Sequence, residues 1–178
     1  VSNSDLHATA PLLDNRGTPL EGVSTDIDNE ARDSEVPDMG ADEFTASGTP
    51  MDGTYAVGPS GAYASLAEAI TALQEVGAIG PVTLSLETGT YLEQITIPPI
   101  SGTSDTTRIT VESASGNAED VTIQYQASGS RDNFVIQLNG ADHFTFRNLS
   151  ITGLNGTYPR VVYLSGGIND IEFENVTF

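Results

Sequence analysis

The chain contains no cysteine and no lysine, and its six basic residues are all arginine, against 25 acidic residues. Without cysteine there is no disulfide framework and no thiol chemistry. The formal net charge of −19 argues against nucleic acid and anionic membranes as partners, because both repel an acidic surface, and it favours cations. No apolar run approaches the length of a membrane span, so we expect no membrane insertion. The absence of lysine fits a protein outside the cell.

Two stretches of alternating apolar and polar residues are close copies of each other. Residues 144–151 read Phe-Thr-Phe-Arg-Asn-Leu-Ser-Ile, and residues 171–178 read Ile-Glu-Phe-Glu-Asn-Val-Thr-Phe, 27 positions later. This alternation has the period of a β-strand with one buried face, and the shared asparagine indicates a turn between two short strands. A strand–turn–strand unit that repeats at this spacing predicts a solenoid of the parallel β-helix type.

The repeat can be followed backwards along the chain. One series of apolar triplets predicts that Ile95, Val121, Phe144 and Ile171 stack in a single column, with about 26 residues per coil. Stacking would also place Asn148 against Asn175 in an inward amide ladder that satisfies turn backbone groups. The alternative is that each asparagine lies in a turn only because asparagine tolerates one.

Residues 64–76 predict a helix ahead of the first coil. Ser65 is a suitable N-cap, Glu68 occupies the capping-box position and Gly77 is a suitable stop. We expect the helix to cover the open end of the core, as a solenoid requires. Its apolar residues recur at helical spacing, at Leu66, Ala69, Ile70 and Leu73.

Several stretches together resemble a known family. Residues 63–70 read Tyr-Ala-Ser-Leu-Ala-Glu-Ala-Ile, residues 89–97 read Gly-Thr-Tyr-Leu-Glu-Gln-Ile-Thr-Ile, and further strands follow at 109–111 and 120–123. They resemble the start of a pectin-lyase-like right-handed parallel β-helix, in the version found in large secreted or cell-surface proteins of Bacteroidetes-type bacteria. The resemblance implies an all-β fold for residues 53–178 and an extracellular location. It implies no particular activity, because this fold carries lyases, hydrolases, esterases and inert stalks.

Residues 1–46 are a different kind of sequence, rich in turns and acidic residues. A His-containing strand, a Pro-Leu-Leu-Asp element, the Asp-Ile-Asp loop at 26–28 and Asp-Met-Gly-Ala-Asp-Glu at 38–43 resemble the closing cap of a secreted bacterial β-helix domain. We therefore expect residues 1–46 to cap a preceding β-helix, residues 47–52 to form a linker, and the coils that begin at residue 53 to continue beyond residue 178.

Alternating carboxylates in the cap segment form the candidate metal site. Asp26, Asp28 and Glu30 could present oxygens to Ca²⁺, with Asp38, Asp42 or Glu43 completing the shell, although the loop lacks the full EF-hand pattern. The alternative reading is structural, with Arg32 neutralising these acids and tying the cap together. Calcium is the one cofactor that the sequence offers.

We assign no catalytic residue. His143 follows Asp142, but neighbours on a strand point to opposite faces and are poorly placed to pair. Arg147 lies one coil before Glu174, which predicts a cross-strand ion pair rather than a lyase base. Thr106, in the Asp-Thr-Thr stretch of a polar loop, resembles the O-glycan acceptor of secreted Bacteroidetes proteins.

The sequence thus favours an architectural function. We expect a stalk or adhesin segment of a long secreted or cell-surface protein, with further β-helix modules of the same chain and cell-surface glycans or polysaccharides as partners. The alternative is a polysaccharide lyase or carbohydrate esterase whose active site lies on later coils.

Overall fold

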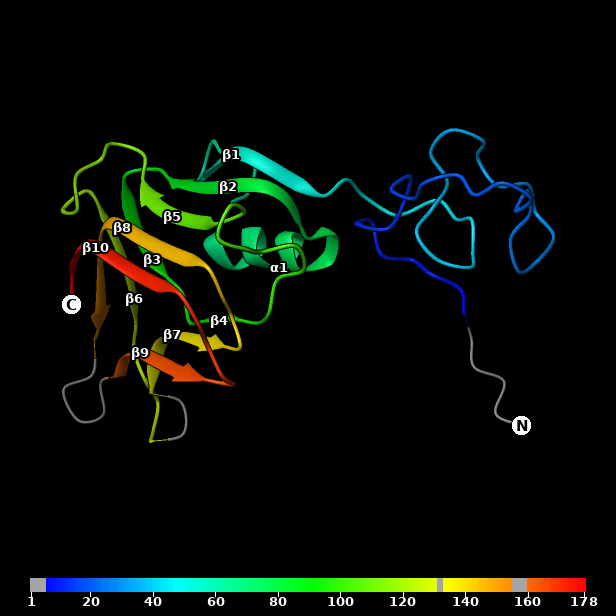
Figure 1. The fold of residues 1–178 in the computed structure, drawn as a ribbon. Coiled ribbons are helices and arrows are strands. Elements are labelled where there is room, and N and C mark those ends of the chain that lie inside the picture. Colours follow the sequence, from blue (N-terminus) through cyan, green and yellow to red (C-terminus); the bar gives the residue numbers. More distant parts are fainter. Residues whose placement is uncertain (1–5, 131–132, 155–159) are drawn as a thin grey trace. The chain divides into compact units, whose positions relative to one another are not determined.

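A computed structural model describes residues 6–130, 133–154 and 160–178 (Figure 1). The chain divides into two compact units, residues 1–50 and residues 51–178, and each is described here by itself. We call them the first unit and the second unit. Strand β1 begins at Met51, two residues before the coils were expected to start, because Met51 is buried and its N–H donates to the carbonyl of Gly77.

The second unit is a parallel β-helix, which confirms the predicted fold class. Every pairing between its named strands is parallel. Within the described residues the elements in chain order are Met51–Val57 (β1), Leu66–Val76 (α1), Ala78–Leu86 (β2), Gly89–Leu92 (β3), Ile95–Ile97 (β4), Ile109–Ser113 (β5), Val121–Tyr125 (β6), Phe134–Asn139 (β7), Phe144–Gly153 (β8), Arg160–Ser165 (β9) and Ile171–Thr177 (β10).

The strands form two sheets that wrap around one core. The larger sheet has the order β1-β2-β5-β8-β6-β3, with β10 also paired to β8, and the smaller sheet has the order β4-β7-β9. Strand β8 turns a corner at Asn148: its first half pairs with β5 and its second half pairs with β6. A single strand therefore serves two faces of the coil.

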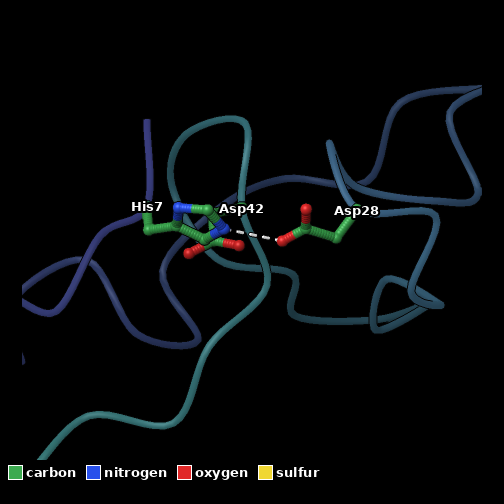
Figure 2. Close-up of side chains that lie close together, drawn as sticks. All are labelled: His7, Asp28 and Asp42. Atoms are coloured by element: carbon green, nitrogen blue, oxygen red, sulfur yellow. Dashed lines mark hydrogen bonds and ion pairs between the residues drawn. The ribbon is translucent and has the colours of Figure 1, made fainter. Parts of the chain in front are cut away.

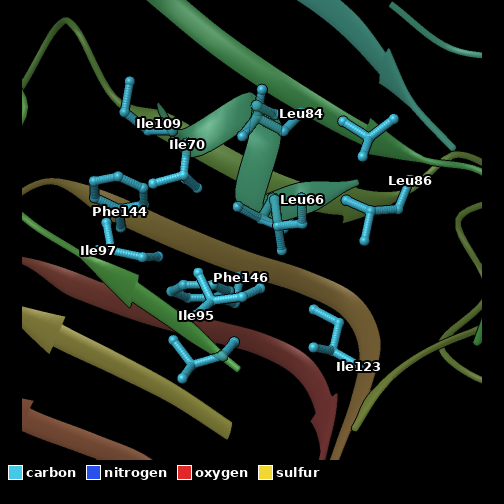
Figure 3. Close-up of a cluster of buried hydrophobic side chains, with 14 of the residues drawn as sticks. Leu66, Ile70, Leu84, Leu86, Ile95, Ile97, Ile109, Ile123, Phe144 and Phe146 are labelled. Atoms are coloured by element: carbon cyan, nitrogen blue, oxygen red, sulfur yellow. The ribbon is translucent and has the colours of Figure 1, made fainter. Parts of the chain in front are cut away.

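The core between the sheets consists of inward-facing aliphatic and aromatic side chains (Figure 3). Phe144 and Phe146 of β8 are fully buried, and the Phe146 ring stacks on that of Phe173 one coil later at 5.2 Å. Like residues therefore lie above like residues, and this contact between coils is what stabilises a solenoid.

The prediction that Ile95, Val121, Phe144 and Ile171 stack in one column is wrong. Phe144 does pair with Ile171, but its partner on the preceding coil is Ile109, whereas Ile95 pairs with Ile136 and Val121 pairs with Gly89. The cause is an uneven coil length. Val82 to Ile109 and Phe144 to Ile171 each span 27 residues, but Ile109 to Phe144 spans 35, because longer loops separate the strands there.

Helix α1 begins and ends where the sequence indicates. The Ser65 hydroxyl accepts the N–H of Glu68, and Gly77 follows the helix with φ 74°. The helix contacts β1, β2 and β4, the first strands of the two sheets, and it buries the expected face of Leu66, Ala69, Ile70 and Leu73. Within the described residues no helix is long and apolar enough to cross a membrane.

Candidate functional site

The first group of polar side chains lies where β5, β8 and β10 begin, and we call it the edge cluster: Asp105, Arg108, His143, Asp170 and Glu172. Arg108 Nη1 lies 2.5 Å from Asp170 Oδ2, and the Asp170 carboxylate also contacts His143 Nδ1 at 2.9 Å. Arg108 Nε donates to the Thr145 hydroxyl at 2.8 Å, so one arginine links three successive coils. Asp105 Oδ1 lies farther from His143, at 3.5 Å.

The electrostatics of the edge cluster favour a structural tie over acid–base catalysis. The hydrogen bond from Arg108, followed by that from His143, holds the pKa of Asp170 below its ordinary value. A carboxylate held ionised in this way is a poor proton donor. Asp142, the sequence neighbour of His143, instead accepts the backbone N–H of Asn169 at 2.5 Å.

Arg147 lies in a second charged row on the outer face of the larger sheet. It is in register with Glu112 on one side and Glu174 on the other, as predicted for Glu174. Its Nη2 lies 2.6 Å from Glu112 Oε2, whereas its Nη1 lies 3.8 Å from Glu174 Oε2. The hydrogen bond to Glu112 raises the pKa of the Arg147 guanidinium, so this arginine stays charged and is not a base.

The outer face of the smaller sheet carries an aromatic patch, which we define as Phe134, Tyr163 and Arg160. The rings of Phe134 and Tyr163 are 6.3 Å apart and tilted, and the Arg160 guanidinium lies 5.1 Å from the centre of the Tyr163 ring. Phe134 and Arg160 also line a small hollow together with Tyr125, Ala127, Asn133, Val135 and Gly153.

Amide and hydroxyl groups continue the surface beside the aromatic patch. Gln137 is in register with Tyr163, and its Nε2 donates to the Ser165 hydroxyl at 3.0 Å. Sequence patterns did not identify this patch, because its members meet only through the register of β7 and β9. In the sequence, Tyr163 is one residue of the apolar stretch Val-Val-Tyr-Leu, which predicts a strand and not a surface patch.

In the first unit the predicted calcium ligands do not converge. Asp26 uses both carboxylate oxygens to accept backbone N–H groups, from Asp28, Glu30 and Glu43. Within the described residues, Asp26, Asp28 and Glu30 do not form a group of close ligand atoms. Asp28 instead faces His7, with 2.7 Å between Oδ2 and Nε2 (Figure 2).

Arg32 holds the acidic loops of the first unit together. Its Nη1 donates to the carbonyl of Gly40 at 2.8 Å, its Nη2 donates to the carbonyl of Asp38, and its Nε lies 3.4 Å from Glu43. These contacts agree with the alternative interpretation, in which Arg32 neutralises the acids and ties the cap together. A cavity of about 440 Å³ lies beside it, lined by Leu20, Val23, Pro37, Met39 and their neighbours.

The remaining predicted positions are on the β-helix. Asn175 Nδ2 donates to Asn148 Oδ1, so the two amides are in contact from coil to coil. Thr106 is exposed in the turn between Ser104 and Thr107, so its hydroxyl is accessible to a glycosyltransferase. Its glycosylation stays a prediction.

Comparison with known proteins supports the fold. No family model matches the chain, and no curated protein matches it. The similar solved structures include two of the pectin methylesterase from Aspergillus niger, one in deglycosylated form and one in penultimately deglycosylated form. Each has 21% sequence identity and a TM-score of 0.53, with 72% of this chain covered and 43% of the other. The chain thus spans less than half the length of these structures, and the likeness is one of fold.

Proposed function

We propose that the chain is an architectural β-helix segment of an extracellular or cell-surface protein, and that its aromatic patch binds a neutral polysaccharide. The observation that carries the proposal is that Phe134, Tyr163 and Arg160 lie together on the outer face of the smaller sheet. Further β-helix modules of the same chain are the proposed structural partners.

The chemistry of the patch supports a sugar ligand. A sugar ring presents C–H groups on its faces and hydroxyls around its edge, so it suits aromatic planes flanked by hydrogen-bonding groups. Tyr163 and Phe134 supply the planes, and Asn133, Gln137 and Arg160 supply the polar groups. The net charge of −19 disfavours a polyuronate, which would be repelled, and this is why we propose a neutral chain.

Contacts between coils support the architectural role. Arg108 connects three coils, Arg147 lies between Glu112 and Glu174, and Asn148 contacts Asn175. Charged and amide side chains on this unit therefore hold neighbouring coils in register. Side chains used in this way resist shear between coils, which a load-bearing segment requires.

A second candidate is a carbohydrate esterase or a polysaccharide lyase with its active site on coils beyond residue 178. The observation that favours it is the likeness of fold to a pectin methylesterase. The same β-helix would then serve as the N-terminal part of an enzyme, and the aromatic patch would be an accessory contact for its substrate.

The test measures binding of the full chain to soluble neutral polysaccharides and to polyuronates by affinity electrophoresis and calorimetry. Tyr163→Ala should weaken binding to the neutral ligand at least tenfold. The control is Tyr55→Ala, because Tyr55 of β1 forms a similar tilted pair with Tyr63 at 6.1 Å; circular dichroism must show that this variant is folded, since Tyr55 packs against the core. Binding that is equally strong in wild type and Tyr163→Ala, or absent in wild type, would refute the glycan contact. Release of methanol from a methyl-esterified glycan by a longer chain that includes coils beyond residue 178 would favour the enzyme candidate.

A further inference from the structure

We propose that His7, Asp28 and Asp42 form a binding site for a first-row divalent cation of the zinc type. The three residues come from separate stretches of the first unit, yet one ligand atom from each lies within 4.8 Å of the other two. Figure 2 shows Asp28 facing the His7 ring, with the Asp42 carboxylate beside that ring. Asp28 and Asp42 were both among the acids considered for the calcium site, whereas Asp26 and Glu30 do not belong to this group.

Asp42 is the anchor of the site, because it is a buried acid that accepts a single hydrogen bond from the described residues. Its exposed fraction is 5%, and the backbone N–H of Ala8 donates to its Oδ2 at 3.1 Å. Among the described residues, no group donates a hydrogen bond to its Oδ1, and no arginine forms an ion pair with it. Burying a carboxylate costs free energy unless hydrogen bonds or a cation compensate, and one carboxylate oxygen of Asp42 lies within 4.8 Å of the ligand atoms of His7 and Asp28.

The other buried acid of the first unit shows what full compensation requires. The Asp38 carboxylate accepts the N–H of Asn15 at 2.5 Å through Oδ1 and the N–H of Phe44 at 2.7 Å through Oδ2. Both of its oxygens are therefore satisfied by the protein alone. Asp42 has one such bond, and a bound cation would supply the rest.

The first unit also has a physical need for a cross-link. The buried hydrophobic core begins at Met51, so none of the described residues of the first unit belongs to it. A segment of about 50 residues without disulfides and without a core usually requires a metal or a partner for stability. An ion held by His7, Asp28 and Asp42 would join residues from both ends of this unit and from its central loop.

The edge cluster provides an internal contrast. Asp105, His143 and Asp170 also lie within 4.8 Å of one another, so geometry alone would make them a second metal site. There the Arg108 guanidinium already lies on Asp170 at 2.5 Å and neutralises it, and it would repel an arriving cation. We therefore assign the metal to the first unit only.

The donor set selects the type of cation. One imidazole nitrogen and two carboxylates suit Zn²⁺ or its first-row neighbours, whereas Ca²⁺ prefers a shell made only of oxygens. Zinc binds its ligands at about 2.0–2.2 Å, and a water molecule would complete four-coordination. His7 and Asp28 are both about half exposed, with side-chain exposures of 53% and 51%, so they are free of core packing that would oppose closing around an ion.

The experiment titrates the full chain with ZnCl₂, followed by calorimetry and by NMR of the two imidazoles. The chain has only two histidines, so the His143 signals serve as an internal reference in the wild-type protein. We expect one Zn²⁺ per chain, shifts confined to His7, and increased hydrogen-exchange protection of residues 6–44. These readouts require no variant and therefore do not depend on whether a substituted first unit still folds.

Variants then assign the ligands. His7→Gln and Asp42→Asn should each weaken Zn²⁺ binding at least tenfold, whereas His143→Gln should leave it unchanged. The proposal is overturned if Zn²⁺ does not bind, if it shifts His143 instead of His7, or if His7→Gln binds it as tightly as wild type. Binding of Ca²⁺ in preference to Zn²⁺ would overturn the assignment of the metal.

Discussion

Asn175 Nδ2 donates a hydrogen bond to Asn148 Oδ1 across 2.9 Å, and the two residues share the same left-handed backbone, with φ of 51° and 52°. The flanking pairs Glu174–Arg147 and Val176–Leu149 are in register on both sides. The corner of β8 is therefore reproduced 27 residues later in β10. Asparagine suits this corner for two reasons. It tolerates the left-handed backbone region, and its side-chain amide forms a hydrogen bond with the next coil.

The first prediction separates these two contributions. Asn148→Ala should destabilise the β-helix by roughly 2–3 kcal/mol, through the left-handed strain of alanine and the lost hydrogen bond. Asn148→Gly removes the side-chain amide, but glycine adopts the left-handed backbone without strain. This variant should therefore cost only about 1 kcal/mol. Urea unfolding followed by circular dichroism measures both. Equal losses for the two variants would show that the amide alone matters.

The second prediction concerns the two carboxylates beside Arg147. Glu112 is closer to the guanidinium than Glu174, at 2.6 Å against 3.8 Å, and it is the less exposed of the two, at 24% against 51%. Glu112→Gln should therefore destabilise more than Glu174→Gln, with both losses below about 1 kcal/mol because Arg147 is itself partly exposed. Thermal unfolding in low salt and in 1 M NaCl provides the check, since screening should reduce both losses. A larger effect of Glu174→Gln would contradict the geometry.

Sequence periodicity predicted the type of fold because the alternation of apolar residues is a direct consequence of strand geometry. The pair Phe144–Ile171 was also predicted correctly, because the copies at 144–151 and 171–178 are long enough to align without ambiguity. Ile95 and Val121 were placed in the wrong column. Each coil contains several short apolar triplets that look alike, and the loops between them vary in length, so spacing alone cannot say which triplet belongs to which sheet.

The candidate sites were harder to predict than the fold. Phe134 and Arg160 meet because β7 and β9 pair in one particular register, and nothing in either strand's own sequence indicates that register. His7, Asp28 and Asp42 meet through loops that have no period at all. The calcium prediction at Asp26 and Glu30 assumed that alternating acids point the same way, whereas Asp26 turns back to accept backbone N–H groups.

The third prediction tests the helix at the start of the core. Leu73 is fully buried on the face of α1 that contacts the first strands, so Leu73→Ala should cost roughly 2–5 kcal/mol. The control is Leu92→Ala, because Leu92 is 71% exposed and its truncation should change stability by less than about 0.5 kcal/mol. Urea unfolding measures both variants. An unchanged midpoint for Leu73→Ala would mean that α1 does not contribute to the core.

The fourth prediction is a pH dependence that arises from the edge cluster. Arg108 and then His143 hold the pKa of Asp170 below its ordinary value of 3.8 in the folded protein. Because the unfolded chain binds this proton more readily, the stabilisation is present in full above that ordinary value. It is lost as the pH falls through the lower, folded pKa, where Asp170 becomes protonated and its ion pair with Arg108 ends.

Asp170→Asn isolates this effect, because asparagine keeps the shape of the side chain and tolerates the φ of 54° at this position. The variant should melt below wild type between pH 5 and pH 7, and the two melting temperatures should converge as the pH falls below the ordinary aspartate pKa of 3.8. Asp105→Asn is the control, since the Asp105 side chain is 92% exposed and only 3.5 Å from His143, and it should follow wild type throughout. A gap between wild type and Asp170→Asn that stays constant down to low pH would mean that shape, and not charge, is what Asp170 contributes.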